Sequence, residues 1–408
     1  MKSRNSRNIK LQGGECLGAG TFGCVLKPHI QCKSNSPIKH TSNNNIISKI
    51  STYNTYNTDD LENIYDEINM SEKVYKLDKE CKYLCPIINY CNIDVNNVID
   101  RTDIKLKNLD TMDDVDLDYS KEGYEKRCIF NINNNFITIN LISVYAGPDL
   151  DYFFNNKSAF DKYKSMLCSN IKLIISNLFE GLKVLHHNKI THKDIKLNNI
   201  CMIIKNNKPV IRYIDFGLSE DINSMKHSYN NINGNGTPAY MAPDFIILNE
   251  MKKQNFNTLL HKKNIAQNII NKLFMSLKSN LSTFTNKGLN KTYLDGNMDT
   301  FTSEINFNMN SIKKESHYFF TKKDITNIYI FLLNLYKNNE LLPYHFTPII
   351  GLNPKFDIFS LGLVLFEIKK LLNIKNILLV NLLKNMLELN SINRYSIDDC
   401  MEHYYMEH

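Results

Sequence analysis

The stretch THKDIKLNNI, residues 191–200, places a His, two Lys, an Asp and two Asn within ten positions and contains no long apolar run. One explanation is biased composition, because Lys, Asn and Ile are frequent throughout the chain. The other explanation is a catalytic loop, in which closely spaced hydrogen-bonding groups act together. The choice depends on whether the rest of the chain supplies the groups with which such a loop would work.

Length and composition are those of an ordinary globular protein. The chain has 408 residues, of which 43% are hydrophobic, so two or three domains with a sizeable core are expected. No segment reaches about 18 consecutive apolar residues, and the N-terminus, MKSRNSRNIK, lacks the apolar region of a secretory signal. We therefore expect no membrane span and an intracellular protein.

Charge and cysteine content argue against some functions. Lys and Arg number 49 against 42 Asp and Glu, which gives a net charge of +7, and the lysines are spread along the chain. Nucleic-acid binding requires a clustered basic face with interleaved aromatic residues, which the sequence does not show clearly. The ten cysteines include no C-x-x-C pair, which argues against a zinc ribbon and a disulfide scaffold.

The first third of the chain is predicted to combine strands with one helix. Residues 13–50 contain a glycine-rich turn and the β-branched run IISKI, both typical of strands and their connections. Apolar residues at helical spacing predict a helix from Leu61 to Leu77. Residues 92–128 are rich in Asp and Asn, and we interpret most of them as a polar insertion between two strands.

The rest of the chain is predicted to be mostly helical. Residues 136–150, FITINLISVYAGPDL, read as a strand that ends in a Gly-Pro turn, and a helical region follows at 158–187. A strand pair is predicted within residues 199–216. Residues 245–350 form an elaboration with amphipathic helical segments, after which residues 356–368, FDIFSLGLVLFEI, begin a Leu- and Ile-rich helical end.

A glycine-rich run, GAGTFGCV, occupies residues 18–25. Glycines let the backbone approach phosphates closely and direct N–H groups at them. The spacing also occurs in Rossmann turns, but there a helix should follow. Here Val25 to Pro28 continue as strand, because Pro28 opposes a helix, so a strand–loop–strand arrangement is predicted. The candidate phosphate loop comprises Gly18, Ala19, Gly20, Thr21, Phe22 and Gly23.

Lys49 lies inside the apolar run IISKI. An unpaired ammonium would be costly to bury there, so the lysine needs an anionic partner. Glu67 and Glu72 on the following predicted helix are both candidates. We prefer Glu67, because Met70 and Val74 lie on its neighbouring helical face.

Two runs together resemble a known family. His192 to Asn199 are similar to the H-R-D-L-K-x-x-N catalytic loop of eukaryotic-type protein kinases, and Asp215-Phe216-Gly217 is similar to their D-F-G magnesium loop. Residues 236–244, GTPAYMAPD, resemble G-T-x-x-Y-x-A-P-E, and residues 357–362, DIFSLG, resemble D-x-W-S-x-G. Arg394 stands where the family's late arginine pairs with the acid of A-P-E, which is Asp244 in this sequence.

The resemblance implies an α+β, bilobal protein-kinase-like fold. After a tail at residues 1–12, a small and mostly β N-lobe with one main helix would span residues 13–145. A larger, mostly α C-lobe with the 245–350 insertion would span residues 146–408. The implied activity is transfer of the ATP γ-phosphoryl group to protein hydroxyls, assisted by Mg²⁺ or Mn²⁺.

The resemblance also implies a role for each matching residue. Asp194 would accept the proton of the substrate hydroxyl or orient that hydroxyl, and Lys196 would neutralise the γ-phosphate. Asn199 and Asp215 would hold Mg²⁺. Lys49, supported by its glutamate, would bind the α- and β-phosphates.

Further positions would contact the nucleotide or select the substrate. The Val144 carbonyl and the Ala146 N–H would face the adenine edge, and Asp149 or Asp151 would reach the ribose. Thr237, together with the lysine two positions after the catalytic aspartate, resembles the Ser/Thr branch, so Ser or Thr hydroxyls are the expected substrates. The residues expected to enclose the adenine ring are Val25, Ile47 and Cys201.

One departure from the family pattern concerns regulation. Lys193 replaces the Arg that captures an activation-loop phosphate in many kinases, and a lysine lacks the bidentate fork. This argues against activation by phosphorylation of that loop, although Ser219, Ser224 and Ser228 remain candidates for modification.

Two other functions stay open at this point. One is a pseudokinase that binds nucleotide as a scaffold without transfer, and the other is a kinase-fold enzyme that acts on a small molecule. The spacing that ends at Cys32 and the long insertion before Asp357 also resemble divergent kinases of large DNA viruses. The expected location is intracellular, in the cytoplasm. For a viral protein, it would be the host cytoplasm or the virion.

Overall fold

The structure is a computed structural model whose chain divides into two compact units. Unit 1 comprises Met1–Gly147 and Arg212–Gly217, and unit 2 comprises Pro148–Ile211 and Leu218–His408. Both units contain helices and strands. The residues that the structure describes are 15–20, 23–27, 29–30, 45–54, 56, 58–93, 104–107, 128–131, 136–222, 236–237, 240, 242, 353–388, 391 and 393–406.

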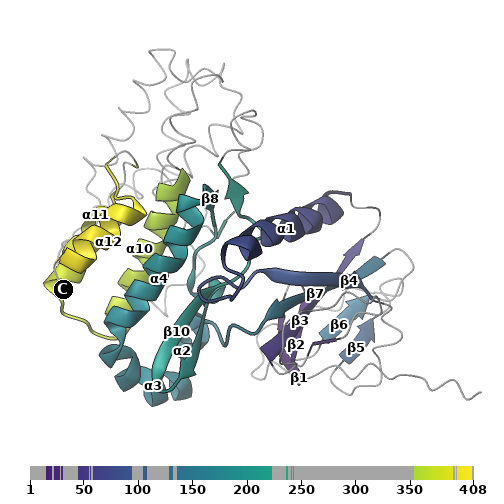
Figure 1. The fold of residues 1–408 in the computed structure, drawn as a ribbon. Coiled ribbons are helices and arrows are strands. Elements are labelled where there is room, and N and C mark those ends of the chain that lie inside the picture. Colours follow the sequence, from purple (N-terminus) through teal and green to yellow (C-terminus); the bar gives the residue numbers. More distant parts are fainter. Residues whose placement is uncertain are drawn as a thin grey trace, which may run out of the picture. The chain divides into compact units, whose positions relative to one another are not determined.

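Unit 1 is built on a five-stranded sheet whose strand order is β1-β2-β3-β7-β4, with antiparallel neighbours (Figure 1). The two central strands, β3 and β7, are the longest, and their register runs unbroken from one end to the other. The sheet comprises β1 (Glu15–Gly20), β2 (Gly23–Lys27), β3 (Ile46–Asn54), β7 (Phe136–Val144) and β4 (Ile87–Asn92).

The glycine-rich run forms the turn between β1 and β2. Gly20 pairs with Gly23 at the end of the ladder, so only Thr21 and Phe22 lie between the strands, and these two residues are outside the described part of the chain. A strand, not a helix, follows the run. The strand–loop–strand prediction is therefore confirmed, and a Rossmann turn is excluded.

Strand β3 divides its side chains between the two faces of the sheet. Ile46, Ser48 and Ile50 are fully buried on one face, whereas Ile47 and Lys49 alternate with them on the other. The buried Ser48 hydroxyl accepts a hydrogen bond from the Ile30 N–H at 2.8 Å, so this polar group satisfies a neighbouring loop.

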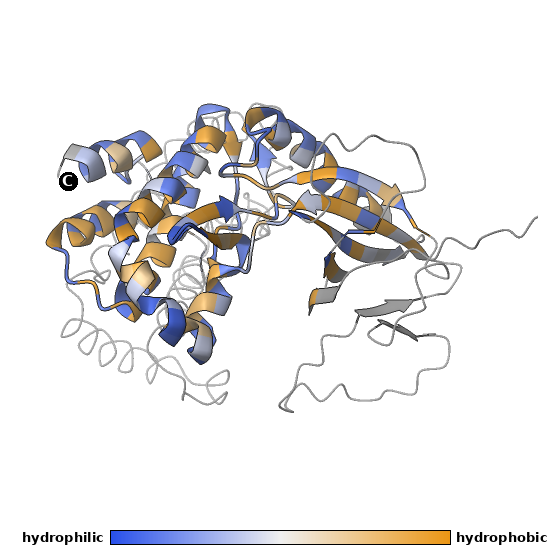
Figure 2. Ribbon diagram, turned by 60° about the horizontal axis from the view of Figure 1, so that its bottom comes forward, coloured by the Kyte–Doolittle hydropathy of each residue, from blue (hydrophilic) through white to orange (hydrophobic). Residues whose placement is uncertain are grey.

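Helix α1 spans Thr58–Leu77, and it confirms the helix predicted from Leu61 onwards, with an earlier start. Its buried isoleucines recur at helical spacing and face the sheet, whose hydrophobic strands appear orange in Figure 2. Each such side chain contributes roughly 1.5–3 kcal/mol when it is buried. The core cluster consists of Ile64, Ile68, Ile87, Ile139 and Leu141.

The predicted polar insertion at 92–128 contains a strand. β5 (Ile104–Lys107) lies within it and pairs in parallel with β6 (Cys128–Asn131) as a separate two-stranded sheet. Residues 94–103 and 108–127 of the insertion lie outside the described residues.

The first passage between the units lies between Gly147 and Pro148, two residues beyond the predicted boundary at 145/146. Tyr145 is tied to unit 1, because its N–H donates to the Asn45 carbonyl at 2.7 Å and its ring lies under the Lys27 ammonium at 3.7 Å. Gly147 has a φ of 100°, a conformation that favours glycine.

The described residues of unit 2 are mainly helical, as the sequence predicted for the C-terminal part of the chain. Helices α3 and α12 pack against α4, whose buried face is rich in Leu and Ile. The helical elements are α2 (Leu150–Asn155), α3 (Lys157–Ser169), α4 (Ile171–His187), the 3₁₀ turn η4 (Leu197–Asn199), α10 (Asn353–Leu371), α11 (Ile377–Met386) and α12 (Ile397–Met406). The predicted helical segments within 245–350 lie outside the described residues.

Two short strand pairs flank the catalytic loop in sequence. β9 (Ile200–Lys205) and β10 (Lys208–Tyr213) form the predicted hairpin, and β8 (Ile190–Thr191) pairs with β11 (Glu220–Asp221). Asn206 has a φ of 50° and Asn207 has a φ of 59°. Positive φ at both central residues is what a two-residue type I′ turn needs, and Asn tolerates it better than most residues.

Arg394 is buried near the start of α10. Its Nε donates to the Glu388 carbonyl at 2.7 Å and one terminal nitrogen donates to the Lys355 carbonyl at 2.9 Å, while the guanidinium lies 5.0 Å from the centre of the Phe359 ring. Its predicted partner, Asp244, lies outside the described residues. Carbonyl acceptors and a ring face thus hold this arginine within the described part of unit 2.

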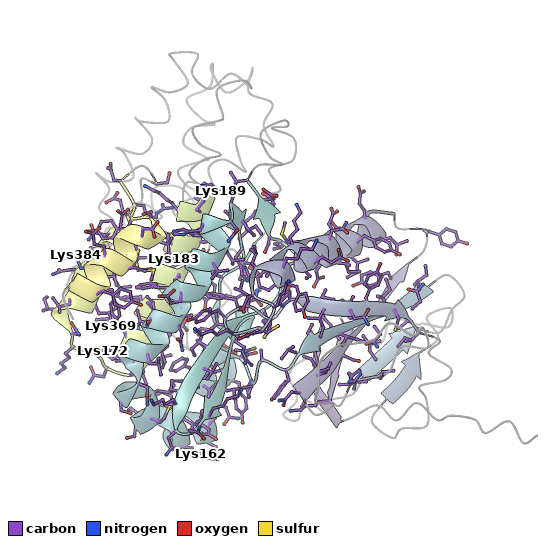
Figure 3. All side chains as sticks on the ribbon, viewed as in Figure 1. Lys162, Lys172, Lys183, Lys189, Lys369 and Lys384 are labelled. Carbon is purple, nitrogen blue, oxygen red and sulfur yellow. The ribbon has the colours of Figure 1, made fainter. Side chains whose placement is uncertain are left out.

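The labelled lysines of unit 2 come from several elements (Figure 3). Lys183 has a carboxylate neighbour, Asp398, at 3.8 Å. Among the described residues, no helix combines the length and apolar character needed to cross a membrane. The labelled lysines are Lys162, Lys172, Lys183, Lys189, Lys369 and Lys384.

Gly362 offers a test of packing between α10 and the end of α11. A Cβ at this position would lie 2.9 Å from Leu387 Cδ2 and 3.1 Å from Met386 Cβ. We expect Gly362→Ala to lower the free energy of unfolding by about 1 kcal/mol, because overpacking outweighs the gain in helix propensity. In a Leu387→Ala background the same substitution should be nearly neutral. Urea unfolding of the four chains checks this, and equal losses in both backgrounds would contradict it.

Candidate active site

Asp194 is the centre of a hydrogen-bonded network in unit 2. Its Oδ1 accepts hydrogen bonds from the Thr237 hydroxyl at 2.7 Å and from the Thr237 N–H at 2.9 Å. Its Oδ2 accepts from the Lys196 ammonium at 2.7 Å and from the Asn199 amide at 2.8 Å. The four residues predicted as catalytic therefore form one cluster.

The other contacts of the network hold its members in one geometry. Lys196 also donates to the Thr237 hydroxyl oxygen at 2.7 Å, and Asn199 also donates to the Asp194 carbonyl at 2.9 Å. Asn199 ends the 3₁₀ turn η4, which places its side chain back against the aspartate. Asn198, the neighbouring residue, is exposed.

The network keeps Asp194 ionised. Burial by itself raises the pKa of this carboxyl group. The hydrogen bonds from Lys196 and Thr237 and the positive charge of Lys196 lower the pKa by more than burial raises it. The net effect is a pKa below the ordinary value. Asp194 is therefore a carboxylate with strong hydrogen-bond acceptors, and it is a weak base at neutral pH.

Asp357 on α10 fixes the backbone that leads to Asp194. Its Oδ2 accepts the His192 N–H at 2.7 Å, and its Oδ1 accepts the Lys193 N–H at 2.8 Å. The same Oδ2 shares a hydrogen bond with His186 Nε2 at 3.0 Å. All of these groups are buried, so the carboxylate satisfies N–H groups that would otherwise be costly to bury.

His192 has a structural position. It is fully buried, and its Nδ1 accepts the Asp194 N–H at 3.4 Å, while its carbonyl accepts the Ser219 hydroxyl at 3.3 Å. Lys193, the next residue, has a left-handed backbone with φ of 67°, and its ammonium lies 2.6 Å from Glu220 Oε1. The sequence did not predict this ion pair.

In unit 1, Lys49 pairs with Glu67. The Lys49 ammonium lies 3.4 Å from Glu67 Oε1, whereas Glu72 is exposed. Glu67 is thus the partner of the two alternatives, and the preferred pairing is confirmed. Burial by itself lowers the pKa of Lys49, but the negative charges of Glu67 and Asp215 raise it above the ordinary value.

Asp215 completes the charged cluster of unit 1. It has a left-handed backbone with φ of 64°, its side chain is exposed, and its charge acts on Lys49 and Glu67. Burial, followed by the charge of Asp215, raises the pKa of Glu67 against the opposing effect of Lys49. Gly217 is next to both acids, because a Cβ there would lie 3.4 Å from Glu67 Oε2 and 3.5 Å from Asp215 Oδ1.

The residues predicted to enclose adenine occupy distinct positions in the two units. Val25 pairs with Lys49 and Ile47 pairs with Ser143, which puts Val25 and Ile47 on the lysine face of the unit 1 sheet. Val144 ends β7, and Ala146 follows it. Cys201 lies in β9 of unit 2, where its backbone pairs with that of Asp149 in an isolated antiparallel β-bridge.

Asp149 and Asp151, the two candidates for a ribose contact, both have protein partners. Asp149 caps α2, because it accepts the Tyr152 N–H at 2.7 Å, and Asp151 accepts from the Asn155 amide at 2.6 Å. Burial raises the pKa of Asp149, although the hydrogen bond from Tyr152 opposes this effect. The capping geometry accounts for Asp149 without a ligand.

The donor set predicted for a metal fits Mg²⁺ in its chemistry. Asn199 and Asp215 offer amide and carboxylate oxygens, which are the ligands that this hard cation prefers. Among the residues that the structure describes, no group of three or more His, Cys, Asp and Glu is arranged to hold a metal. Mg²⁺ in such a site would take its remaining ligands from phosphates and water.

Three features of the site were missed by sequence reasoning. They are the partners of Asp357, the pair formed by Lys193, and a contact in which the Tyr240 hydroxyl donates to Glu367 Oε2 at 3.0 Å. Burial raises the pKa values of both Tyr240 and Glu367. A sequence signal exists for Asp357 only, since an Asp inside the apolar run FDIFSLGLVLF needs polar partners.

Comparisons with known proteins found relatives of part of the chain. The model of the protein kinase domain family matches residues 128–259. A bifunctional serine/threonine-protein kinase/NEDD4-like E3 ubiquitin-protein ligase of Dictyostelium discoideum is 35% identical over 130 residues, which are 32% of this chain and 6% of that protein. Serine/threonine-protein kinase pakG of the same organism is 34% identical over 95 residues, or 23% of this chain and 7% of pakG.

A third relative comes from yeast. The meiosis-specific serine/threonine-protein kinase MEK1 of Saccharomyces cerevisiae is 34% identical over 98 residues, which are 24% of this chain and 19% of that protein. The matches thus cover only a small part of each relative's length. Together with the site, they support a eukaryotic-type protein kinase.

The ion pair of unit 1 predicts different effects for two glutamates of one helix. We expect Glu67→Gln to lower the free energy of unfolding by about 1–2 kcal/mol, because the partly buried Lys49 ammonium loses its charged partner. Glu72→Gln is the matched control, and its effect should stay within about 0.5 kcal/mol. Urea unfolding at neutral pH measures both, and equal effects would contradict the assignment of Glu67.

Asp194 predicts a pH dependence of stability. Its pKa in the folded chain lies below the ordinary value of 3.8, so the ionised carboxylate stabilises the fold above that pH. This contribution is lost as the pH falls through the folded-state pKa. We expect Asp194→Asn to lose less stability than the wild type between about pH 5 and pH 3, with Thr237→Val intermediate. Parallel curves in urea unfolding would contradict the lowered pKa.

Proposed function

We propose that this chain transfers the γ-phosphoryl group of ATP to Ser or Thr hydroxyls of proteins. The observation that carries the proposal is the network in which Asp194, Lys196, Asn199 and Thr237 contact one another. A carboxylate acceptor beside a lysine and an amide is what phosphoryl transfer requires, because that reaction depends on positioning and charge stabilisation.

The electrostatics of Asp194 indicate how it acts. Its lowered pKa makes it a weak base, so it would orient the substrate hydroxyl by accepting a hydrogen bond, and take the proton late in the transfer. Lys196 already lies 2.7 Å from the carboxylate. Its ammonium would stabilise negative charge that develops on the transferred group.

The residues of unit 1 would bind the phosphates. Glu67 holds Lys49 in place and, with Asp215, keeps it protonated, so that a fixed positive charge is offered to the α- and β-phosphates. The glycine turn between β1 and β2 would present backbone N–H groups to the same phosphates. Val25 and Ile47 would contact the adenine ring from the lysine face of the sheet.

Asn199 and Asp215 are the residues that we propose as ligands of Mg²⁺. The bound ion supplies positive charge that neutralises phosphate oxygens during transfer. On the protein side, the hydrogen bonds from the Asn199 amide nitrogen to Asp194 restrain the amide plane. The exposed carboxylate of Asp215 is held by a backbone conformation that few residues adopt.

The Ser/Thr preference is supported by the contact between Lys196 and Thr237. It brings together the lysine and the threonine whose presence resembles the Ser/Thr branch of the family. The names of the relatives also describe serine/threonine kinases. We also propose that the chain is related to kinases of large DNA viruses. An alignment with such kinases tests this, because a proline and a cysteine should recur there at the spacing of Pro28 and Cys32.

A transfer assay with labelled ATP and a generic basic protein tests the activity. We expect Asp194→Ala and Asp215→Asn to reduce transfer by at least about 100-fold, because they remove the hydroxyl acceptor and a metal ligand. The control is Asn198→Ala, which changes an exposed residue of the same loop and should leave transfer within about twofold of the wild type. Mg²⁺ and Mn²⁺ are compared as the added ion.

Each other outcome has a definite meaning. Equal transfer by the wild type and Asp215→Asn would indicate a contaminating kinase. Nucleotide binding without transfer by the wild type, in either metal, would favour the scaffold function of a pseudokinase. Transfer to a small hydroxyl compound but to no protein would favour a kinase-fold enzyme that acts on a small molecule.

A further inference from the structure

The ion pair between Lys193 and Glu220 has no role in the transfer mechanism above. The Lys193 ammonium lies 2.6 Å from Glu220 Oε1, and the exposed fractions of the two side chains are 4% and 18%. A lysine buried to this degree needs a carboxylate, because leaving one member of a buried pair alone is strongly destabilising. Lys193 is the residue directly before Asp194.

The pair belongs to a short ribbon that joins two segments of unit 2. Thr191 pairs with Glu220 and Ile190 pairs with Asp221. The Ile222 N–H donates to the Lys189 carbonyl at 2.8 Å, which extends the pairing of the two strands by one residue beyond Ile190 and Asp221.

Side chains close the ribbon at its other side. The Thr191 hydroxyl donates to the Glu220 carbonyl at 3.3 Å, and the Ser219 hydroxyl donates to the His192 carbonyl at 3.3 Å. The chain from Ser219 to Ile222 is therefore bound to the chain from Lys189 to Lys193 by both main-chain and side-chain groups. The ion pair is the charged contact of this ribbon nearest to Asp194 along the chain.

The backbone at Lys193 has an unfavourable conformation that contacts with its surroundings must maintain. Its φ of 67° is in the left-handed region, which is unfavourable for a residue with a Cβ and persists where the surroundings enforce it. Two of the contacts that the structure describes there do so: Asp357 accepts the Lys193 N–H, and Glu220 forms an ion pair with the Lys193 ammonium. A change at Glu220 would thus reach Asp194 through a single strained residue.

We propose that Glu220 is a positioning residue that holds the catalytic loop in its working geometry without phosphorylation of the chain. This inference rests on the proposed function. A phosphate brought to Lys193 would carry about two negative charges next to the Glu220 carboxylate, in a place with little solvent, and would be repelled. The chain carries its own carboxylate at this lysine, so phosphorylation there is not needed to order the loop.

The first experiment breaks and restores the pair in the full chain. We expect Glu220→Gln to lower kcat for transfer at least about tenfold and to leave the KM for ATP within about twofold, because the ATP-binding lysine is not involved. Lys193→Met should behave similarly. The double variant Lys193→Met/Glu220→Leu should recover at least about fivefold over Lys193→Met, because it removes both charges of the pair together.

The control is Asp398→Asn, which removes the carboxylate of an exposed contact with Lys183 and His187 and should change kcat by less than about twofold. A Glu220→Gln chain with wild-type kcat would overturn the proposal. So would a double variant as poor as Lys193→Met. If Glu220→Gln fails to fold, as judged by circular dichroism, the comparison of the double variant with Lys193→Met decides.

The second experiment addresses phosphorylation directly. The wild-type chain is treated with a broad-specificity phosphatase, its loss of phosphate is verified by intact mass, and the initial rate of transfer is measured. The rate should remain within about twofold of the untreated chain. A loss of tenfold or more that returns on rephosphorylation would overturn the proposal.

A third measurement separates this proposal from the proposed function. If the wild type shows no transfer, the proposed function fails. Hydrogen exchange then tests whether Glu220 restrains the loop that precedes Asp194. Faster exchange of residues 189–194 in Glu220→Gln than in Asp398→Asn supports the role of Glu220. Equal exchange in the two variants overturns it.

Discussion

The buried carboxylate of Asp357 is the constraint on which the loop around Asp194 depends. Its two oxygens accept the N–H groups of His192 and Lys193, which stand immediately before Asp194 in the chain. These N–H groups lie in a segment that turns through a left-handed residue, where no strand or helix can satisfy them. A carboxylate at the start of a well-packed helix provides acceptors in a fixed place. The loop can therefore be irregular, and still be held in one conformation.

Charge is handled in opposite ways at the two charged clusters. Burial raises the pKa of Asp194, but the hydrogen bonds from the Lys196 ammonium and the Thr237 hydroxyl and the charge of Lys196 outweigh it, so the pKa falls. Glu67 has Lys49 as its charged partner and Asp215 as a like charge, so burial prevails and its pKa rises. The number of donors around each carboxylate decides the result. The rise in the pKa of Lys49 follows from the same cluster, because two acids act on one ammonium.

Much of the fold could be predicted from local patterns. The apolar spacing of α1, the glycine turn between β1 and β2 and the strand pair formed by β9 and β10 all appear in the structure where the sequence placed them. In each case the residues that form the element are close in sequence, so periodicity and turn chemistry are sufficient. The pairing of Lys49 with Glu67 could also be chosen, because helical periodicity separates the two candidate glutamates of α1.

The sequence by itself determined the main helices and strands, the order of the motifs and the residue types of the candidate site. Only the tertiary structure decided which groups satisfy one another. Asp357 reaches His192 across 165 positions, and Thr237 reaches Asp194 across 43. Lys193 meets Glu220 through a two-residue strand pair that has no periodic signal of its own. Such partners are set by the packing of distant segments, because burial requires every charge and N–H group to find an acceptor or donor, while local sequence does not say where it lies.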